Sequence, residues 1–184
     1  MADLTTLAKV KRHIFGANPV ADDDDILERL ISEASTEFER RTDRQIASSS
    51  IVETFNGSGL TQKVLREYPV TAVSSVTVNG ETIPARPSVT EDGWILDEST
   101  IRLVGYYFTE GTANCVVTYT AGYTTVPADV EGAVIQLVAL RFSERDRIGQ
   151  MSRSSADGTV AFQTTSLPYA IRAVIDDWKR VLGP

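Results

Sequence analysis

Apolar residues recur at helical spacing at both ends of the chain and alternate with polar residues in the middle. Near the amino terminus, a one-sided apolar stripe from Leu4 to Phe15 stops at a glycine. A second stripe from Ile26 to Phe38 follows the aspartates at 22–25. Aspartates favour the cap and first turn of a helix, where the helix dipole is positive. We therefore expect two helices within residues 1–48.

The middle of the chain, residues 49–122, is built from short runs in which apolar and polar residues alternate. Two of these runs flank Asn79-Gly80, a dipeptide typical of a two-residue hairpin turn. We expect a small antiparallel sheet folded over itself, as a sandwich or a partial barrel. Its strands are predicted at residues 51–55, 63–68, 73–78, 81–83, 94–96, 101–104 and 115–119.

A long apolar helix follows the last of these strands. Pro127 has a backbone angle preset for a helix start, and apolar residues continue to Phe142. The polar residues Glu131, Gln136 and Arg141 are spread around this helix, so none of its faces is wholly polar. Such a helix must be buried on most sides. We expect it to contact its own neighbours and other subunits.

Residues 149–166 are rich in serine, threonine and glycine, and they precede a last helix that starts at Pro168. A loop this long is uncommon in a compact domain unless it is functional or disordered. Val160 and Phe162 alternate with other residues within it, which is enough to add a strand to a sheet edge. We expect a docking arm that does not order alone. A plain disordered loop is the alternative.

Together these patterns predict an α+β fold. A helical bundle of about four helices, with one long central helix, carries an inserted antiparallel β-sandwich or partial-barrel subdomain. The predicted divisions are N-terminal helices in residues 1–48, the β subdomain in residues 49–122, and the central helix, arm and C-terminal helix in residues 123–184. The helical parts are expected to form one domain.

Composition narrows the class of protein. The chain has 184 residues and a formal net charge of −7, so a DNA-binding or membrane-binding surface is not expected. The single cysteine, Cys115, lies in a strand pattern and is expected to be a buried apolar residue in a reducing compartment. No signal peptide pattern is present, and no apolar run reaches the roughly 20 residues of a membrane span. We expect a soluble protein made in a cytoplasm.

The sequence offers little for catalysis or for binding a small ligand. The single histidine, His13, lies near the end of a short helix, where a surface or capping role is common. One histidine and one cysteine do not make a zinc site, and the aspartates at 22–25 lack the spacing of a calcium loop. Residues 56–59 lack the lysine and the following helix of a phosphate loop. We predict no enzymatic activity, no cofactor and no metal.

An arginine stripe near the end of the central helix has acidic residues interleaved with it. A track for nucleic acid needs an unbalanced positive field, so this pattern favours a salt-bridged protein interface. The residues that we expect at protein–protein contacts are Arg141, Arg145 and Arg147 of the stripe, Val160 and Phe162 of the arm, and Tyr169 and Trp178 of the last helix.

Two classes of function fit these features. The apolar central helix and the long loop favour a structural protein that assembles with other subunits. The alternative is a small ligand-binding or carbohydrate-binding domain that uses an aromatic surface of the β subdomain. That surface would consist of Trp94, Tyr106, Tyr107 and Phe108.

Four short motifs occur in a set order along the chain. They are Asp24-Asp25-Ile26-Leu27 at a helix start, Arg41-Thr42-Asp43-Arg44 at its end, Tyr68-Pro69-Val70 through Val76 at a strand entry, and Val117 to Tyr123 with Pro127 to Val130 before the long helix. This order resembles the head–tail connector (adaptor) proteins of tailed bacteriophages. The resemblance covers nearly the whole chain, although residues 149–166 carry no motif of that family.

The resemblance implies a head-completion adaptor: a ring of about twelve identical subunits in the virion neck. Its partners would be the portal protein on one side and the tail, a stopper or a tail-terminator protein on the other. DNA would cross the ring without specific binding, and no membrane would be involved. The subunits would be made in the host cytoplasm. Another neck or tail-completion ring protein is the alternative within this class.

Overall fold

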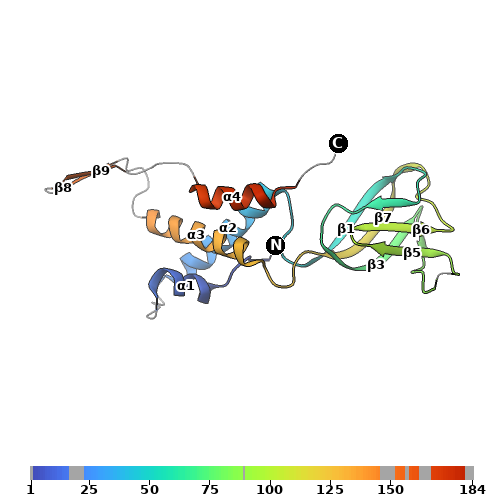
Figure 1. Ribbon diagram of the computed structural model, residues 1–184, viewed down its shortest axis with the longest axis horizontal. Coiled ribbons are helices and arrows are strands. Elements are labelled where there is room, and N and C mark those ends of the chain that lie inside the picture. The colour runs from blue at the N-terminus through green and yellow to red at the C-terminus, as the bar shows by residue number, and fades with distance from the viewer. Residues whose placement is uncertain are drawn as a thin grey trace. The chain divides into compact units, whose positions relative to one another are not determined.

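The computed structural model describes residues 2–16, 23–88, 90–145, 152–155, 158–161 and 167–180, with the backbone alone for 152–155 and 158–161. Within these residues the protein is α+β, with four helices and antiparallel sheets (Figure 1). The chain divides into two compact units. One consists of Met1–Arg44 and Val126–Pro184, and the other is Gln45–Thr125.

The first unit contains the helices α1 (Leu7–Phe15), α2 (Asp24–Thr42), α3 (Ala128–Glu144) and α4 (Tyr169–Trp178). Prolines directly precede α3 and α4, as the sequence predicts. Acidic residues occupy the first turn of α2 and arginines its last turn, which complements the helix dipole. Asp23, at the N-cap, makes no side-chain capping hydrogen bond, so the aspartates act on this helix through their charge.

The start of α1 differs from the prediction. The predicted apolar stripe begins at Leu4, but the helix begins only at Leu7, with Thr6 at the N-cap. Leu4 is buried, and its N–H donates to Ser35 Oγ of α2 at 3.0 Å. The chain therefore packs onto α2 before its first helix begins.

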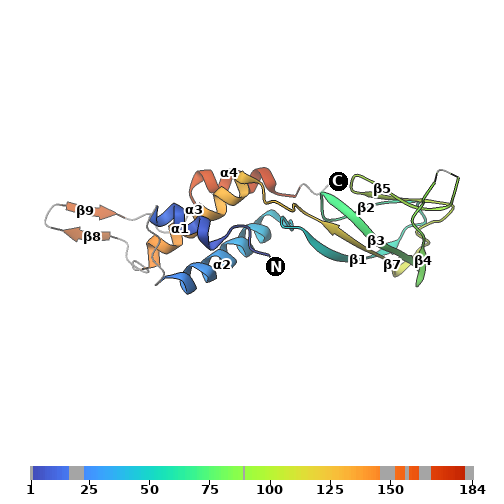
Figure 2. The ribbon, with the colours of Figure 1, turned by 90° about the horizontal axis from the view of Figure 1, so that it is seen from below.

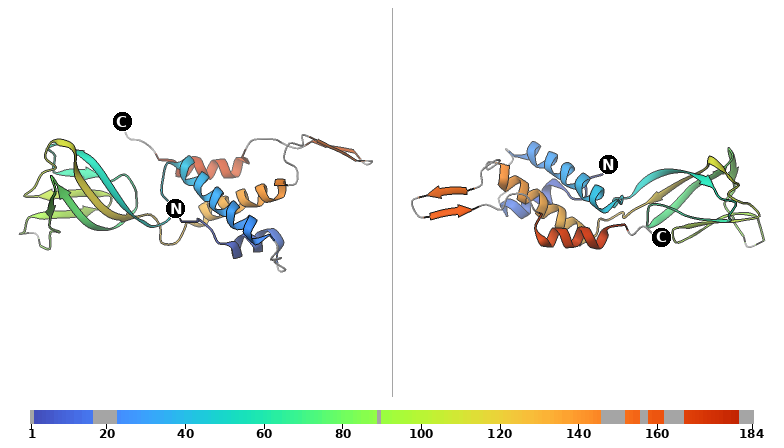
Figure 3. Two further views of the ribbon diagram at one scale, coloured as in Figure 1. Left: turned by 180° about the vertical axis from the view of Figure 1, so that it is seen from behind. Right: turned by 90° about the horizontal axis from the view of Figure 1, so that it is seen from above.

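The central helix α3 contacts each of the other three helices, and Figure 3 shows it flanked by α2 and α4. One such contact is the edge-to-face packing of Phe142 on Phe15 of α1, with ring centroids 5.7 Å apart. The other buried residues of α3 are Val130, Ala133, Val134, Leu137 and Val138. The burial of α3 is therefore achieved inside the subunit. The apolar pattern of this helix does not require contact with other subunits.

The second unit contains two antiparallel sheets. One has the strand order β1-β7-β3-β4, and its strands are β1 (Ser49–Gly57), β7 (Gly111–Ala121), β3 (Val70–Val78) and β4 (Glu81–Ile83). The other has the order β2-β6-β5, with β2 (Gln62–Val64), β6 (Thr100–Val104) and β5 (Gly93–Asp97). The predicted hairpin is present between β3 and β4, with Asn79 and Gly80 at φ 53° and 82°.

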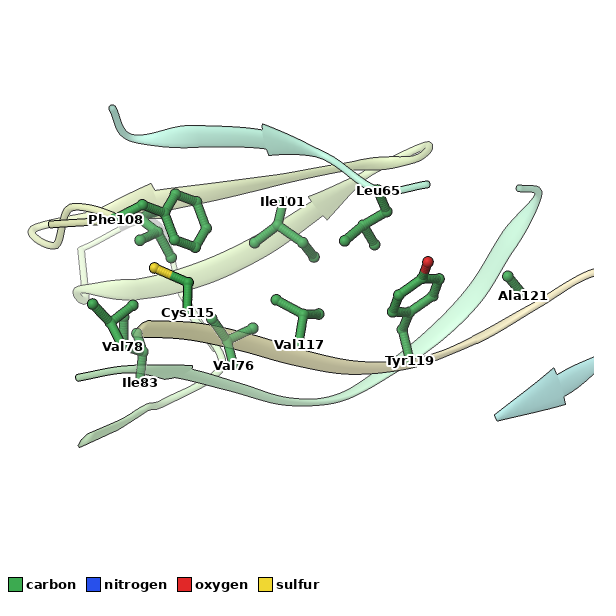
Figure 4. Close-up of a cluster of buried hydrophobic side chains, with 11 residues drawn as sticks. Leu65, Val76, Val78, Ile83, Ile101, Phe108, Cys115, Val117, Tyr119 and Ala121 are labelled. Carbon is green, nitrogen blue, oxygen red and sulfur yellow. The ribbon is translucent and has the colours of Figure 1, made fainter. Parts of the chain in front are cut away.

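The two sheets share one apolar core, shown in Figure 4. Val76, Val117 and Tyr119 of the four-stranded sheet point toward Ile101 of β6 and Leu65, which directly follows β2. Residues that alternate with these along each strand point away from the core, as a two-layer packing requires. Cys115 belongs to this core and is buried, as predicted.

Within the predicted docking arm, β8 (Ser152–Ser155) and β9 (Gly158–Ala161) pair antiparallel with each other and lie side by side in Figure 2. A strand around Val160 and Phe162 was predicted, but we expected it to be added to the edge of another sheet. The partner strand lies in the same arm, because a chain that reverses within a few residues offers the nearest unpaired backbone. The remaining residues of the arm lie outside those that the structure describes.

Candidate interaction surfaces

The arginine stripe of α3 faces α2 of the same subunit. Arg141 Nη2 donates to Glu37 Oε2, and Arg41 Nε donates to Glu37 Oε1 at 2.6 Å. Burial by itself would raise the pKa of Glu37, but the two guanidinium groups outweigh it and hold this pKa below its ordinary value. Glu37 is therefore a carboxylate that is held between two arginines and joins α2 to α3.

Arg145, at the end of α3, has a similar role. Its Nη2 lies 3.6 Å from Asp23 Oδ1, and its guanidinium carbon lies 3.7 Å from the centroid of the Phe142 ring. Arg141 and Arg145 thus contact acidic residues of their own subunit. The third arginine of the predicted interface, Arg147, lies outside the described residues.

The side chain of Arg141 also borders an open depression of about 560 Å³ on α2. Its wall combines three arginines with two glutamates, so the depression has no strong charge of either sign. The lining residues are Arg29, Ser32, Glu33, Thr36, Glu37, Arg40 and Arg141.

The two predicted contact residues of α4 differ in their surroundings. Trp178 Nε1 donates to Asp129 Oδ2 at 2.7 Å, and the Arg44 guanidinium lies 5.1 Å from the Trp178 ring centroid. Trp178 therefore fixes the end of α4 to the start of α3. Tyr169, at the other end of α4, is 85% exposed. For the arm residues, Val160 lies on β9 with only its backbone described, and Phe162 lies outside the described residues.

The aromatic surface considered for ligand or carbohydrate binding is not formed. Phe108 is buried, and Trp94 and Tyr106 pack against the core of the β unit. Of these four aromatic residues, only Tyr107 is well exposed. In the strand and the loop that contain these residues, alternate side chains enter the core. The four aromatic side chains therefore do not lie together on one face. The ligand-binding alternative thus loses the surface on which it depended.

The structure also shows exposed apolar residues that were not singled out in the sequence. Val52 of β1 and Val64 of β2 are each 65% exposed, and Leu60 between these strands is 58% exposed. The alternation along β1 contains the signal, because Val52 must point outward when Ile51 and Phe55 pack against the core.

The described residues contain no group of three or more histidine, cysteine or acidic side chains that could hold a metal ion. No helix among them is long and apolar enough to cross a membrane. Burial raises the pKa of the Cys115 thiol, so this residue stays protonated inside its core at neutral pH.

Comparison with known proteins gives a family and a set of similar folds. A family model described as "Head completion protein" matches residues 3–181. The structure "Neck of empty GTA particle computed with C6 symmetry" has a TM-score of 0.65 at 20% identity and covers 98% of this chain and 93% of its own. "Neck of native GTA particle computed with C12 symmetry" has a TM-score of 0.64 at 20% identity and covers 100% and 97%.

A third similar structure, "Virion of native gene transfer agent (GTA) particle", has a TM-score of 0.63 at 19% identity and covers 98% of this chain and 93% of its own. At this level of identity, the likeness establishes the fold. A comparison with curated proteins gave no significant match.

Proposed function

Because the chain belongs to the head completion protein family, whose model matches residues 3–181, we propose that it is a structural protein of the neck of a tailed phage or a phage-like particle. It forms a ring adaptor between the portal and the tail or its stopper. The observation that carries this proposal is the likeness, over nearly the whole chain, to structures described as necks of gene transfer agent particles.

The ring that we propose has about twelve identical subunits, in keeping with the twelvefold symmetry named for one of the similar structures. Its partners are the portal protein on one side and the tail, a stopper or a tail-terminator protein on the other. The protein resides in the virion neck and is made in the host cytoplasm. Its role is structural rather than enzymatic.

The charge of the chain supports a channel that DNA crosses without being gripped. The net charge is −7, and a polyanion is repelled by an acidic wall rather than held on it. The arginines of α3 support the same role, because Arg141 and Arg145 pair with acidic residues of their own subunit. Neutralised guanidinium groups do not form a phosphate track.

Within the ring, we propose that the helical bundle and the inserted β sandwich have separate tasks. Tyr169, together with Val160 and Phe162 of the arm, contacts a neighbouring subunit or the portal. Arg141, Arg145 and Trp178 support that contact by fixing α3 and α4 in place. Arg147 belongs to the same proposed interface.

Removal of the protein tests this function. Particles that lack it are expected to accumulate as DNA-filled heads and separate tails, and the purified protein should restore joining when it is added to the heads. Restoration after addition to the tails alone would favour the alternative, a tail-completion ring. Normal numbers of joined particles without the protein would contradict both the adaptor and the tail-completion hypothesis.

A further inference from the structure

The outward face of the four-stranded sheet carries no ionisable side chain. Residues that pair across β1, β7, β3 and β4 point to the same side, and the outward set is made only of threonine, serine, valine and alanine. The acidic residues of these strands, Glu53 and Glu81, pair with Val117 and Val78 and so fall on the opposite, core side. The outward residues are Ser50, Val52, Thr54, Ala72, Ser75, Thr77, Thr82, Val116, Thr118 and Thr120. We call this set the threonine face.

Such a face is unusual for a sheet in contact with water. Natural antiparallel sheets place charged residues on the wet side and protect an edge strand with lysine or proline. Strand β1 is an edge of this sheet, is nine residues long and contains neither residue. Val52, in the middle of β1, is 65% exposed. The threonine face therefore has the features of a surface that another protein covers.

The outward face of the three-stranded sheet has a second apolar patch. Its aliphatic residues are Val64, Ile95 and Val104, each from a different strand, and we call the outward side of this sheet the valine face. Its one arginine, Arg102, lies 3.3 Å from the carboxylate of Asp97, so the pair adds no net charge. Val64 is as exposed as Val52, at 65%.

The two faces lie on opposite sides of the β unit, because the two sheets enclose a common core between them (Figure 4). This arrangement suits a closed ring. Each subunit must present two different surfaces, one to each neighbour, whereas a two-fold dimer needs only one self-complementary patch.

Charge indicates what covers these faces. Every copy of the chain has a formal net charge of −7, so two copies repel each other wherever their acidic surfaces meet. Contact between copies is least costly where neither surface has net charge, and both faces meet this condition. Hydroxyl groups can donate as well as accept, so the threonine face can also satisfy polar groups at the rim of a neighbour.

From this geometry we propose that the β units stack around the ring, with the threonine face of one copy packed on the valine face of the next. This rests on the proposed ring and identifies the surfaces that close it. The occupant of each face is a second copy of this chain. The contact lies in the β unit and is separate from the one proposed for α4 and the arm.

A charge-exchange experiment tests the pairing. Val52→Lys places a cation on the threonine face and Val64→Glu an anion on the valine face. Each single variant should lower ring assembly on isolated heads by at least about tenfold, because an unpaired charge is buried against a surface without net charge. The double variant should return to within about threefold of the wild type, since lysine of one copy then faces glutamate of the next.

Thr90→Lys and Thr90→Glu are matched controls, because residue 90 is exposed and lies on neither face. The thermal midpoint of each variant verifies its fold. Should Val52→Lys fail to fold, Thr54→Lys on the same face takes its place. If the wild type and the controls form no rings, the proposed function itself fails.

Three results would overturn the stacking while leaving the ring intact. One is normal assembly of both single variants. Another is loss in the single variants without rescue in the double variant, since the faces would then contact something other than each other. The third is normal rings that fail to join tails, because the occupant would then be another neck protein.

Discussion

At the scale of single residues, Glu37 links α2 to α3 through Arg41 and Arg141. The pKa of this carboxyl is lowered in the folded protein, so its contribution to stability is present above the ordinary value of 4.5 and is lost as the pH falls through the folded pKa. Glu37→Gln should therefore lower the free energy of unfolding by about 1 kcal/mol at neutral pH, and by much less in acid.

Urea denaturation at several pH values measures this difference. Glu33→Gln is the control, because Glu33 is more exposed and its only described ion pair, with Arg29, is long at 3.6 Å. A Glu37→Gln effect that stays constant from neutral to acid pH would show that the charge of this residue does not hold the helices together.

Tyr119 is a second residue with a specific role, in the core of the β unit. Its hydroxyl donates to Glu53 Oε2 at 2.8 Å and accepts from the N–H of Glu67 at 3.1 Å. Burial and the two nearby carboxylates raise the pKa of Tyr119, so the hydroxyl keeps its proton and remains a donor.

Tyr119→Phe should cost about 1–2 kcal/mol of unfolding free energy, because the N–H of Glu67 loses its acceptor. Chemical denaturation checks this value against Tyr107→Phe, in which the altered ring is exposed. Similar stabilities of the two variants would mean that the hydroxyl is not used.

At the scale of elements, the helix α3 organises the helical unit. Leu137 is buried where α3 meets its neighbours, and the adjacent Gln136 is exposed. Leu137→Asp should cost roughly 4 kcal/mol, since an unpaired carboxylate would be buried, whereas Gln136→Asp should cost little. Thermal unfolding followed by helical circular dichroism compares the two variants. A stable Leu137→Asp protein would contradict the packing described for α3.

The glycines of the β unit offer a matched pair of tests. Gly80 has φ +82° with nothing within 4 Å of an added Cβ, so Gly80→Ala should cost about 1 kcal/mol through backbone strain alone. Gly122 has φ +100°, and an added Cβ would lie 2.7 Å from the carbonyl oxygen of Ala47. Gly122→Ala should therefore cost more, about 2–4 kcal/mol.

Denaturation followed by Trp94 fluorescence in a Trp178→Phe background reports on the β unit for both glycine variants. Equal costs at the two positions would show that the approach of Gly122 to residue 47 is less close than described.

Most of the elements could be predicted from the sequence, because their signals are local. Proline before α3 and α4, Asn79-Gly80 in the hairpin and strict alternation in β7 each act within a few residues. The start of α1 could not be predicted, since it depends on a hydrogen bond between Leu4 and Ser35, distant in the sequence. The in-chain partner of β9 was missed because β8 has a polar sequence with no apolar alternation.

The protein–protein contacts stay a prediction, because the structure shows only contacts within one chain. The arginine stripe was recognised, but its partners Glu37 and Asp23 lie on α2 and at its N-cap, and periodicity does not reveal which helices face each other. The aromatic cluster was misread for a similar reason: adjacent aromatic residues of a strand and its following loop point in different directions. The alternation along β1 is enough to place Val52 on the outward side. That the whole outward face lacks charge is seen only from the pairing of β1 with β7.

At the scale of the whole molecule, we propose that two units with different tasks form one structural subunit. The helical unit is held together by its own ion pairs and by the apolar surface of α3. The outward faces of the two sheets in the β unit have no net charge. In the account proposed here, these units build a ring that lines the passage from head to tail.

Electron microscopy of isolated necks tests this account most directly, with the chain labelled at its carboxyl terminus by a small rigid tag. We expect a closed ring of tagged subunits between the portal and the tail, with one tag density for each subunit around a central channel. Tag density located elsewhere in the particle, or a single copy off the particle axis, would contradict it.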